Sequence, residues 1–556
     1  MLPNKLNIKY FNEWKYWSIL LFVCACIFSC PFVSTQYLDR IDVLFHLNRI
    51  EGIKEGLLAL EIPVRIHGYQ MNGYGVADGI MYPDLFLYFP AVLRILGVPI
   101  EIAWNVFWIF LIAFGLLIST LGYTLWTNNL RSGVVAAILH SSVLLYVYIM
   151  GQMVGDYPAV MTLPLAFAAM LKILQNEVNA KYWIFFAIAF TVICENHIIN
   201  TLFVVIAGLL ACVYYRKAFL NPLQRNSIFK AAGFSLLLNL WHIVPFLYFY
   251  KNVAFHINNP PLYESLHTNS TTLFLLAKNA FFIGWSIVIL TIFFLFRNYQ
   301  NKKFVCSVIF MVFLVLTDWK YFPWEFIEKN FPLGSFLPNF QLPIRFFSVG
   351  LVFLCLFLGK FLADVLETKR SVIALTGAFI VAFSALYQYN VPKYYEYGDL
   401  ADIGFGTYRK LETLPSYTSK YGVVQEDYLY ADVDFHKLRN DKGEVYDSND
   451  YKSDAVIFDV KKQATRLEFS YIAEHDTKVQ VPLFYWKGYE AKNEKGERLY
   501  LNSGEHRFME IEIPKGDGRV FLHYAGLWSF RICDVVSLIS LMIFACLCNR
   551  ERERFL

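Results

Sequence analysis

The sequence predicts a polytopic α-helical membrane protein with an extracytoplasmic β-rich domain near its C-terminus. Of its 556 residues, 57% are hydrophobic and only 17% are charged, which is unusual for a soluble globular protein. Long apolar runs alternate with short clusters of Lys and Arg, as they do in proteins that cross a membrane several times. The net charge of +4 is spread over the loops, so no nucleic-acid partner is expected.

We predict about twelve transmembrane helices, because each needs roughly 17–25 apolar residues. They lie near residues 16–34, 100–125, 133–150, 158–175, 182–195, 198–215, 231–250, 271–296, 304–317, 346–365, 371–388 and 528–548. Basic residues cluster in alternate loops of this arrangement, so both termini are expected in the cytoplasm. The first apolar run is too long for a cleavable signal peptide. We therefore predict a multi-pass protein of the cell membrane.

These spans predict three parts of the chain. Residues 1–389 form a transmembrane module with a large first extracytoplasmic loop at 35–99, residues 390–527 form an extracytoplasmic β-rich domain, and residues 528–556 form a final helix with a basic cytoplasmic tail. Alternating apolar and polar residues predict strands at Val456–Val460, Thr465–Tyr471, Val479–Tyr485 and Phe508–Ile513. All ten cysteines lie in apolar segments, so neither a structural disulfide nor a cysteine metal site is expected.

A polar stripe follows the first predicted span. On a helix, Asp39, Asp42, His46 and Arg49 fall at i, i+3, i+7 and i+10, and therefore share one face. A carboxylate and an imidazole at the mouth of a membrane protein can move a proton or hold a metal. A divalent cation such as Mn²⁺, Mg²⁺ or Zn²⁺ could bind to Asp39, Asp42 and His46. Because one helical face would supply every ligand, we predict no metal site and no certain cofactor.

Ionisable residues also stand at the predicted outward ends of later spans: Asp156, Glu195, His197 and Arg345. His242 is a further candidate. Such groups are costly at membrane depth and indicate function by default. Their common side predicts a single outward-facing polar cavity that also includes the stripe of the first loop. The alternative is that each residue pairs locally or contacts lipid headgroups. A Gly/Tyr-rich stretch, Gly68–Gly75, either lets the backbone approach a flat ligand such as a sugar ring or simply forms a turn.

Several short motifs resemble one family. Asp42-x-x-x-His46, Pro63-Val-Arg65, Gly73-Tyr-Gly75 and Tyr82-Pro83 resemble the first loop of GT-C fold membrane glycosyltransferases, and more narrowly the bacterial YfhO-like group. Gln341-Leu-Pro-Ile-Arg-Phe-Phe347 is similar to that group's Gln-x-Pro-x-Arg-Phe element. Pro482–Tyr489 resembles a strand of its extracytoplasmic domain, with Tyr489 where tryptophan is common. The resemblance follows the order of elements over nearly the whole chain.

The resemblance implies an inverting transfer of a sugar from a polyprenyl-phosphate carrier to a cell-envelope polymer or lipid at the outer face. Asp42 matches the general base, and a carboxylate suits deprotonation of an acceptor hydroxyl. His46 would orient Asp42 or bind phosphate, while Arg65 and Arg345 would stabilise the leaving phosphate. The remaining substrate-binding candidates are Asp39, Tyr74, Asp156, His197 and Gln341. The predicted partners are the lipid-linked sugar donor, the acceptor and membrane lipids.

Two other functions remain open from the sequence. A transporter or flippase of an envelope glycolipid precursor would need a cavity that reaches both sides, often with inverted repeats, and no repeat is visible. A non-catalytic scaffold would use its β domain to bind polysaccharide, and the aromatic run Phe484-Tyr-Trp486 could stack on sugar rings. Packing within the β domain explains the same aromatic residues.

Overall fold

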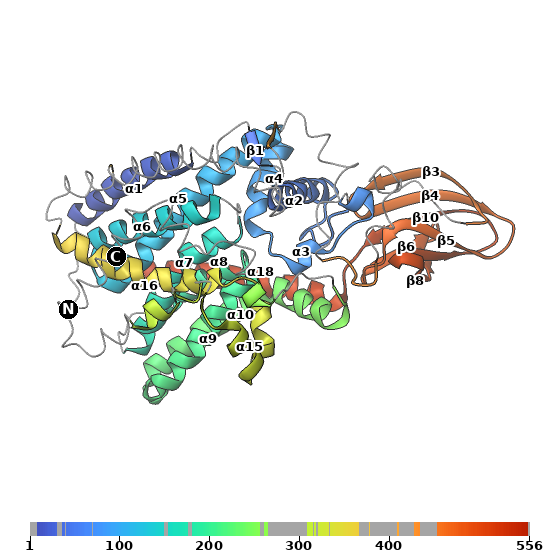
Figure 1. The fold of residues 1–556 in the computed structure, drawn as a ribbon. Helices are drawn as coiled ribbons and strands as arrows, with labels where there is room; N and C mark the ends of the chain where they lie inside the picture. The colour runs from blue at the N-terminus through green and yellow to red at the C-terminus, as the bar shows by residue number, and fades with distance from the viewer. Residues whose placement is uncertain are drawn as a thin grey trace.

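The fold comes from a computed structural model and combines a helical part with a β-sandwich at one end (Figure 1). It describes residues 8–29, 36–38, 41–68, 70–149, 154–175, 181–255, 261–264, 309–314, 316–318, 321–332, 334–365, 377, 408–410, 428–433 and 453–553.

The helical part contains both long apolar helices and short helices of the first loop. The α-helices are α1 (Ile8–Ser29), α2 (Ile41–Leu58), α3 (Asp78–Met81), α4 (Tyr88–Ile95), α5 (Ile100–Thr127), α6 (Leu130–Ile149), α7 (Asp156–Leu174), α8 (Lys181–Cys194), α9 (Ile198–Tyr214), α10 (Pro222–Asn252), α15 (Trp324–Asn330), α16 (Ile344–Val365) and α18 (Trp528–Glu553). The 3₁₀ segments are η1 (Met71–Gly73), η2 (Leu85–Leu87), η3 (Arg216–Leu220), η4 (Gly334–Phe340) and η8 (Glu505–Arg507).

Five of the described helices, α5, α7, α10, α16 and α18, are long and apolar enough to cross a membrane. Shorter apolar helices accompany them at Trp14–Ser29, Leu85–Ile95, Leu130–Leu145, Tyr182–Cys194 and Ile198–Tyr214. The chain is therefore a membrane protein. The count of about twelve spans stays a prediction, because the expected spans at 271–296 and 371–388 fall almost entirely outside the described residues.

The membrane-length helices differ in how much of their surface is buried inside the protein. In α7, 89% of the apolar window is buried inside the protein, against 17% in α18, so α18 lies at the edge of the bundle. Close approach of α5 to α7 depends on glycine: a Cβ on Gly122 would come within 2.4 Å of the backbone nitrogen of Leu165. The buried rings of Trp104 and Trp108 fill the same core with edge-to-face contact.

The β-rich domain is an antiparallel sandwich. One sheet has the order β3 (Val456–Gln463), β4 (Arg466–Ala473), β10 (Gly516–Tyr524), β6 (Tyr489–Asn493) and β7 (Arg498–Leu499). The other has the order β5 (Thr477–Phe484), β9 (Phe508–Ile513) and β8 (Leu501–Ser503). The predicted β-rich domain is confirmed, and the four predicted strands coincide with β3, β4, β5 and β9. A short pair outside the sandwich joins β1 (Gln36–Leu38) to β2 (Tyr408–Lys410).

The first loop and the sandwich share one hydrophobic core. Met71, Tyr74 and Ile80 of the loop belong to the same buried cluster as Phe469 and Trp486 of the sandwich. Figure 1 shows the sandwich beside α3 and α2 at the end of the molecule where the loop lies. The loop is therefore not a free linker, and the sandwich is not an independent appendage.

The turn between β3 and β4 inserts into the first loop. Glu61 Oε1 accepts hydrogen bonds from the backbone nitrogen of Thr465, at 3.2 Å, and from its hydroxyl. Gly68 lies so close to this turn that a Cβ there would stand 2.2 Å from the carbonyl oxygen of Ala464. That oxygen is backbone and cannot rotate away, so Gly68 is required for docking.

We expect Gly68→Ala to loosen the contact between the first loop and the sandwich. The added methyl group overlaps backbone at 2.2 Å, and such overpacking costs roughly 1–3 kcal/mol. The thermal midpoint of the full chain in detergent should fall. Gly233→Ala is the matched control, because a Cβ there meets nothing within 4 Å. Equal midpoints for the two variants would contradict the docking described here.

Candidate functional site

The first loop is held to α2 by a buried arginine. The Nη2 atom of Arg49 donates to the carbonyl oxygens of Tyr82, at 3.0 Å, and Pro83, at 2.8 Å, and to the carboxylate of Asp84. Its guanidinium also lies 4.5 Å from the ring centre of Tyr82. Because an arginine keeps its charge when buried, these partners are what make its burial tolerable. Arg49 therefore fixes the backbone of the loop at 82–84.

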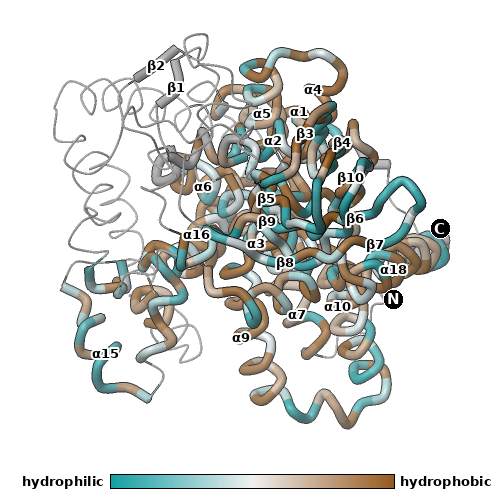
Figure 2. The backbone as a smooth tube through the Cα atoms, turned by 90° about the vertical axis from the view of Figure 1, so that its right-hand side faces the viewer, coloured by the Kyte–Doolittle hydropathy of each residue, from teal (hydrophilic) through white to brown (hydrophobic). Residues whose placement is uncertain are grey.

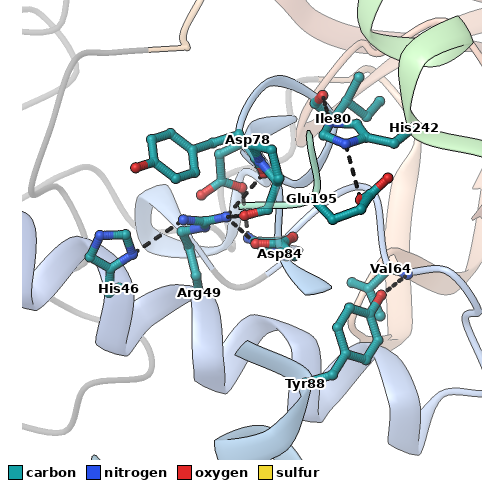
Figure 3. Close-up of polar contacts among 12 residues, drawn as sticks. His46, Arg49, Val64, Asp78, Ile80, Asp84, Tyr88, Glu195 and His242 are labelled. Carbon is teal, nitrogen blue, oxygen red and sulfur yellow. Dashed lines mark hydrogen bonds and ion pairs between the residues drawn. The ribbon is translucent and has the colours of Figure 1, made fainter. Parts of the chain in front are cut away.

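Arg49 belongs to a balanced set of four charged groups, here called the loop cluster: Arg49, His67, Asp78 and Asp84 (Figure 3 labels all but His67). His67 Nδ1 lies 2.6 Å from Asp78 Oδ1, and its Nε2 lies 3.3 Å from Asp84 Oδ2. Burial alone would lower the pKa of His67, but the two carboxylates outweigh burial and raise it to about 9. Arg49 and protonated His67 then face the side chains of Asp78 and Asp84, and all four side chains are buried.

Asp84 shows the complementary effect. Burial alone would raise its pKa, but the charges of Arg49 and His67 outweigh burial and hold the pKa below its usual range. The partners of His67 and Asp84 thus favour the charged form of each, as expected of a structural ion-pair network.

His46 differs from His67 because its charged partner is a cation. Arg49 Nη1 lies 3.2 Å from His46 Nδ1, and an arginine can only donate, so Nδ1 accepts this hydrogen bond. Burial, reinforced by Arg49, lowers the pKa of His46 well below its usual value. A neutral imidazole that accepts at Nδ1 carries its proton at Nε2. His46 is therefore a hydrogen-bond donor towards any further partner.

A second group of polar side chains, here called the helix-end cluster, comprises Asp156, His197, Asn200 and Arg345. Asp156 Oδ1 accepts from Asn200 Nδ2 at 2.7 Å and lies 3.3 Å from His197 Nδ1, while Arg345 Nε lies 3.9 Å from its other oxygen. All four side chains are buried. Burial lowers the pKa of His197 to about 4 despite the carboxylate beside it. The cluster joins α7, the start of α9 and the start of α16.

Tyr82 connects the two clusters. Its ring centre lies 5.9 Å from that of His46 and 6.2 Å from that of His197. Its hydroxyl reaches α7, since a Cβ on Gly155 would stand 2.7 Å from it. The ring of Tyr82 thus links His46 of α2 to the helix-end cluster.

A third contact joins the α8–α9 connection to α10. His242 Nδ1 lies 3.2 Å from Glu195 Oε2, and His242 Nε2 lies 3.2 Å from the carbonyl oxygen of Ile80 (Figure 3). A carbonyl oxygen can only accept a hydrogen bond, so Nε2 of His242 carries a proton. The hydrogen bond between Nδ1 and Glu195 needs a second proton, which lies on one of these two groups. Burial raises the pKa of Glu195, although His242 opposes that rise.

The predicted site residues fall into distinct places. His46 and His197 both contact the ring of Tyr82, and Asp156 and Arg345 adjoin His197 in the helix-end cluster. Asp42 is the second residue of α2, one turn before His46, but its side chain lies outside the described part, and so does Asp39 entirely. Gln341 precedes α16 with a positive φ of 61°.

Arg65 and Tyr74 point elsewhere. Arg65 Nη2 donates to Asp534 Oδ1 at 2.5 Å and to the carbonyl oxygen of Trp241 at 2.9 Å, so its guanidinium ties the loop to α18 and α10. The ring of Tyr74 packs against Phe484 and Phe508 of the sandwich, with centres 5.7 Å and 4.8 Å away.

The glycine-rich stretch forms a turn. Gly73 and Gly75 have φ values of 92° and 81°, which other residues rarely adopt. The carbonyl oxygen of Gly75 accepts from Trp486 Nε1 at 3.0 Å. Trp486 and Phe484 are both fully buried, so these two rings form core and are closed to a sugar ring.

The sequence interpretation missed His67, Asp78 and Asp84, and it treated Tyr82 only as part of a motif. Each stands in a stretch of the first loop that reads as apolar and turn-like. Their charge could have revealed them. The loop is too apolar to be fully solvated, so two carboxylates and a histidine within it need buried partners. Arg49, at the end of the polar stripe, was the matching cation.

No protein-family model matches the chain, and no curated protein matches it. Among solved structures, the chain is similar to electron cryomicroscopy structures of the arabinofuranosyltransferase AftD from Mycobacteria, with 14% identity and a TM-score of 0.39 over 67% of this chain and 26% of that one. A single-residue mutant of AftD gives 13% identity and a TM-score of 0.37 over 67% and 27%. The chain thus spans about a quarter of the length of that enzyme.

We expect the loop cluster to make stability depend on pH through His67. Its folded pKa of about 9 lies above the ordinary 6.5, so its contribution is complete below pH 6.5 and is lost as pH rises through about 9. The shift corresponds to about 3 kcal/mol. Thermal midpoints of wild type and His67→Gln in detergent should therefore converge between pH 6.5 and 10.

The matched control is His475→Gln, because the His475 side chain is 64% exposed. Its pH curve should run parallel to that of the wild type. Parallel curves for wild type and His67→Gln would show that the loop cluster does not hold a protonated histidine.

Proposed function

We propose that the protein is a membrane glycosyltransferase that moves a sugar from a polyprenyl-phosphate carrier to a cell-envelope polymer or lipid. The observation that supports the proposal is a chain of contacts through Tyr82, which connects His46 of α2 to His197, Asp156 and Arg345 at the ends of three later helices. Buried ionisable groups at the ends of membrane helices suit a reaction site better than a lipid-facing surface. The motif resemblance of the first loop points to the same chemistry.

The proposed general base is Asp42. It stands in the first turn of α2, and the positive end of the helix dipole favours negative charge there. One turn later, about 6 Å along the axis, His46 offers an Nε2 proton that can orient a carboxylate or hold a phosphate oxygen. Asp42 would take the proton of the acceptor hydroxyl as that oxygen attacks the anomeric carbon and the lipid phosphate leaves with inversion.

Arg345 is the proposed partner of the leaving phosphate. Its Nη1 donates to the carbonyl oxygen of Phe340 at 2.7 Å, which fixes the guanidinium, while its buried Nε has no hydrogen-bond partner among the described residues. The nearest carboxylate, Asp156, is 3.9 Å away. Its charge is therefore less completely neutralised than those of Arg49 and Arg65, each of which bonds directly to a carboxylate. A fixed cation in a dry site stabilises developing phosphate charge effectively.

We expect Asp42→Asn to abolish sugar transfer while preserving folding and lipid binding. Loss of a general base typically slows a reaction by about 10²–10⁴-fold. The assay uses purified full-length protein, a panel of short-chain polyprenyl-phosphate sugars with radiolabelled sugar groups, and cell-envelope extracts as acceptors. Asp364→Asn is the matched control, since Asp364 is exposed at the far end of α16 from Arg345.

Three measurements on the wild type separate the alternatives: sugar transfer, lipid transport and polysaccharide binding. A flippase would show no transfer by the wild type but would move the labelled lipid across vesicles, and a scaffold would do neither while binding polysaccharide. Transfer that persists at the wild-type rate in Asp42→Asn would eliminate Asp42 as the base.

Substitution by lysine should have different effects at Arg345 and at Arg65. Arg345→Lys keeps the charge but loses the planar fork, and kcat should fall on the order of a hundredfold with little change in thermal midpoint. Arg65→Lys should lower the midpoint, because it weakens the 2.5 Å contact with Asp534, and leave kcat per folded molecule nearly unchanged. The reverse pattern would reassign the phosphate partner to Arg65.

A further inference from the structure

Two adjoining cavities follow α9 away from the helix-end cluster. The first, of about 280 Å³, lies among α7, α8, α9 and α10, and its lining is almost wholly apolar, with Phe190, Val204, Gly208 and Ile243 among its residues. The second, of about 700 Å³, lies at the far ends of α7 and α9. Leu174 lines both, so the two cavities adjoin, and together they are here called the groove.

The far end of the groove is polar and positively charged. The second cavity is lined by Gln175, Tyr214, Tyr215, Arg216 and Lys217. Tyrosine beside arginine and lysine is typical of the depth at which a membrane meets water. Figure 2 shows the same change, with α9 largely hydrophobic and hydrophilic segments at the turn that follows it.

The dimensions of the groove match one leaflet. From Val204 to Tyr214, α9 advances by about 15 Å at the helical rise, and half of a hydrocarbon core is also about 15 Å. His197 caps the opposite end of the 17-residue helix α9. The basic end is thus about 25 Å from the helix-end cluster, so the groove is separate from the proposed reaction site.

We propose that this groove binds one anionic phospholipid. Its acyl chain would lie in the apolar part, and its phosphate would contact Arg216 and Lys217. Charge complementarity selects the headgroup: both side chains are exposed, and within the described residues neither has a carboxylate within 4.0 Å. A zwitterionic lipid such as phosphatidylcholine also carries a phosphate, but its choline cation cancels that charge and would leave the groove mouth with a net positive charge.

Small side chains keep the apolar part open. A Cβ placed on Gly208 would meet only the Sδ atom of Met170, at 3.7 Å, which is ordinary contact. Ala231 and Ala232 line the opposite wall. The space is therefore available to a lipid chain, and a larger side chain at 208 would occupy it without displacing backbone.

The test compares lipids that differ only in the headgroup. Native mass spectrometry of the full chain in detergent would give apparent affinities for phosphatidylglycerol and phosphatidylcholine with identical acyl chains. We expect the wild type to prefer phosphatidylglycerol, and R216Q/K217Q to lose that preference by roughly tenfold. The control K251Q/K495Q removes two exposed charges elsewhere and should behave as the wild type.

A second pair of variants tests the apolar part. Gly208→Leu should weaken binding of both lipids at least about fivefold, whereas Gly233→Leu, placed where a Cβ meets nothing within 4 Å, should not. Equal binding of the two lipids by the wild type would overturn the proposal. So would an unchanged preference in R216Q/K217Q.

Discussion

The ion pair between Arg49 and Asp84 is the constraint on which the rest of the structure depends. Both groups are buried, and an unpaired charge at either position would cost several kcal/mol. The same guanidinium holds the carbonyl oxygens of Tyr82 and Pro83, so the pair fixes the backbone path of the loop as well as its charge balance. Tyr82 is thereby placed between His46 and His197, where the two polar clusters meet.

The first loop, fixed in this way, contributes residues to two hydrophobic cores. Its inner edge packs through α2 against the helices, where Leu47 and Ile50 belong to the helical core. Its outer edge, including Met71 and Tyr74, belongs to the core of the sandwich. A change at the sandwich interface can therefore reach the clusters through a single continuous piece of packed chain. We infer that the sandwich stabilises the loop conformation in addition to any role of its own.

Much of the architecture could be predicted from the sequence, because apolar length and period-two alternation report directly on helices and strands. The edges of α5, α7, α16 and α18 lie within a few residues of the predicted spans. Pairing between charged residues could not be predicted, since it depends on which loops meet in space. Arg49 appears in the sequence as part of the stripe with Asp42 and His46, yet its carboxylate partner lies 35 residues further along the chain. Arg65 likewise finds Asp534 in the last helix.

The three arginines that are buried in the described part of the chain then divide into two kinds. Arg49 and Arg65 each bond directly to a carboxylate and to backbone carbonyls, so their charge is neutralised by the fold and their role is to hold the loop. Arg345 bonds to the carbonyl oxygen of Phe340, and its nearest carboxylate, on Asp156, is shared with Asn200. His46 and His197, both kept neutral by burial, add no positive charge around Tyr82. An anionic group entering this region would therefore find its electrostatic partner in Arg345, and the proposed phosphate contact follows from how the other cations are already satisfied.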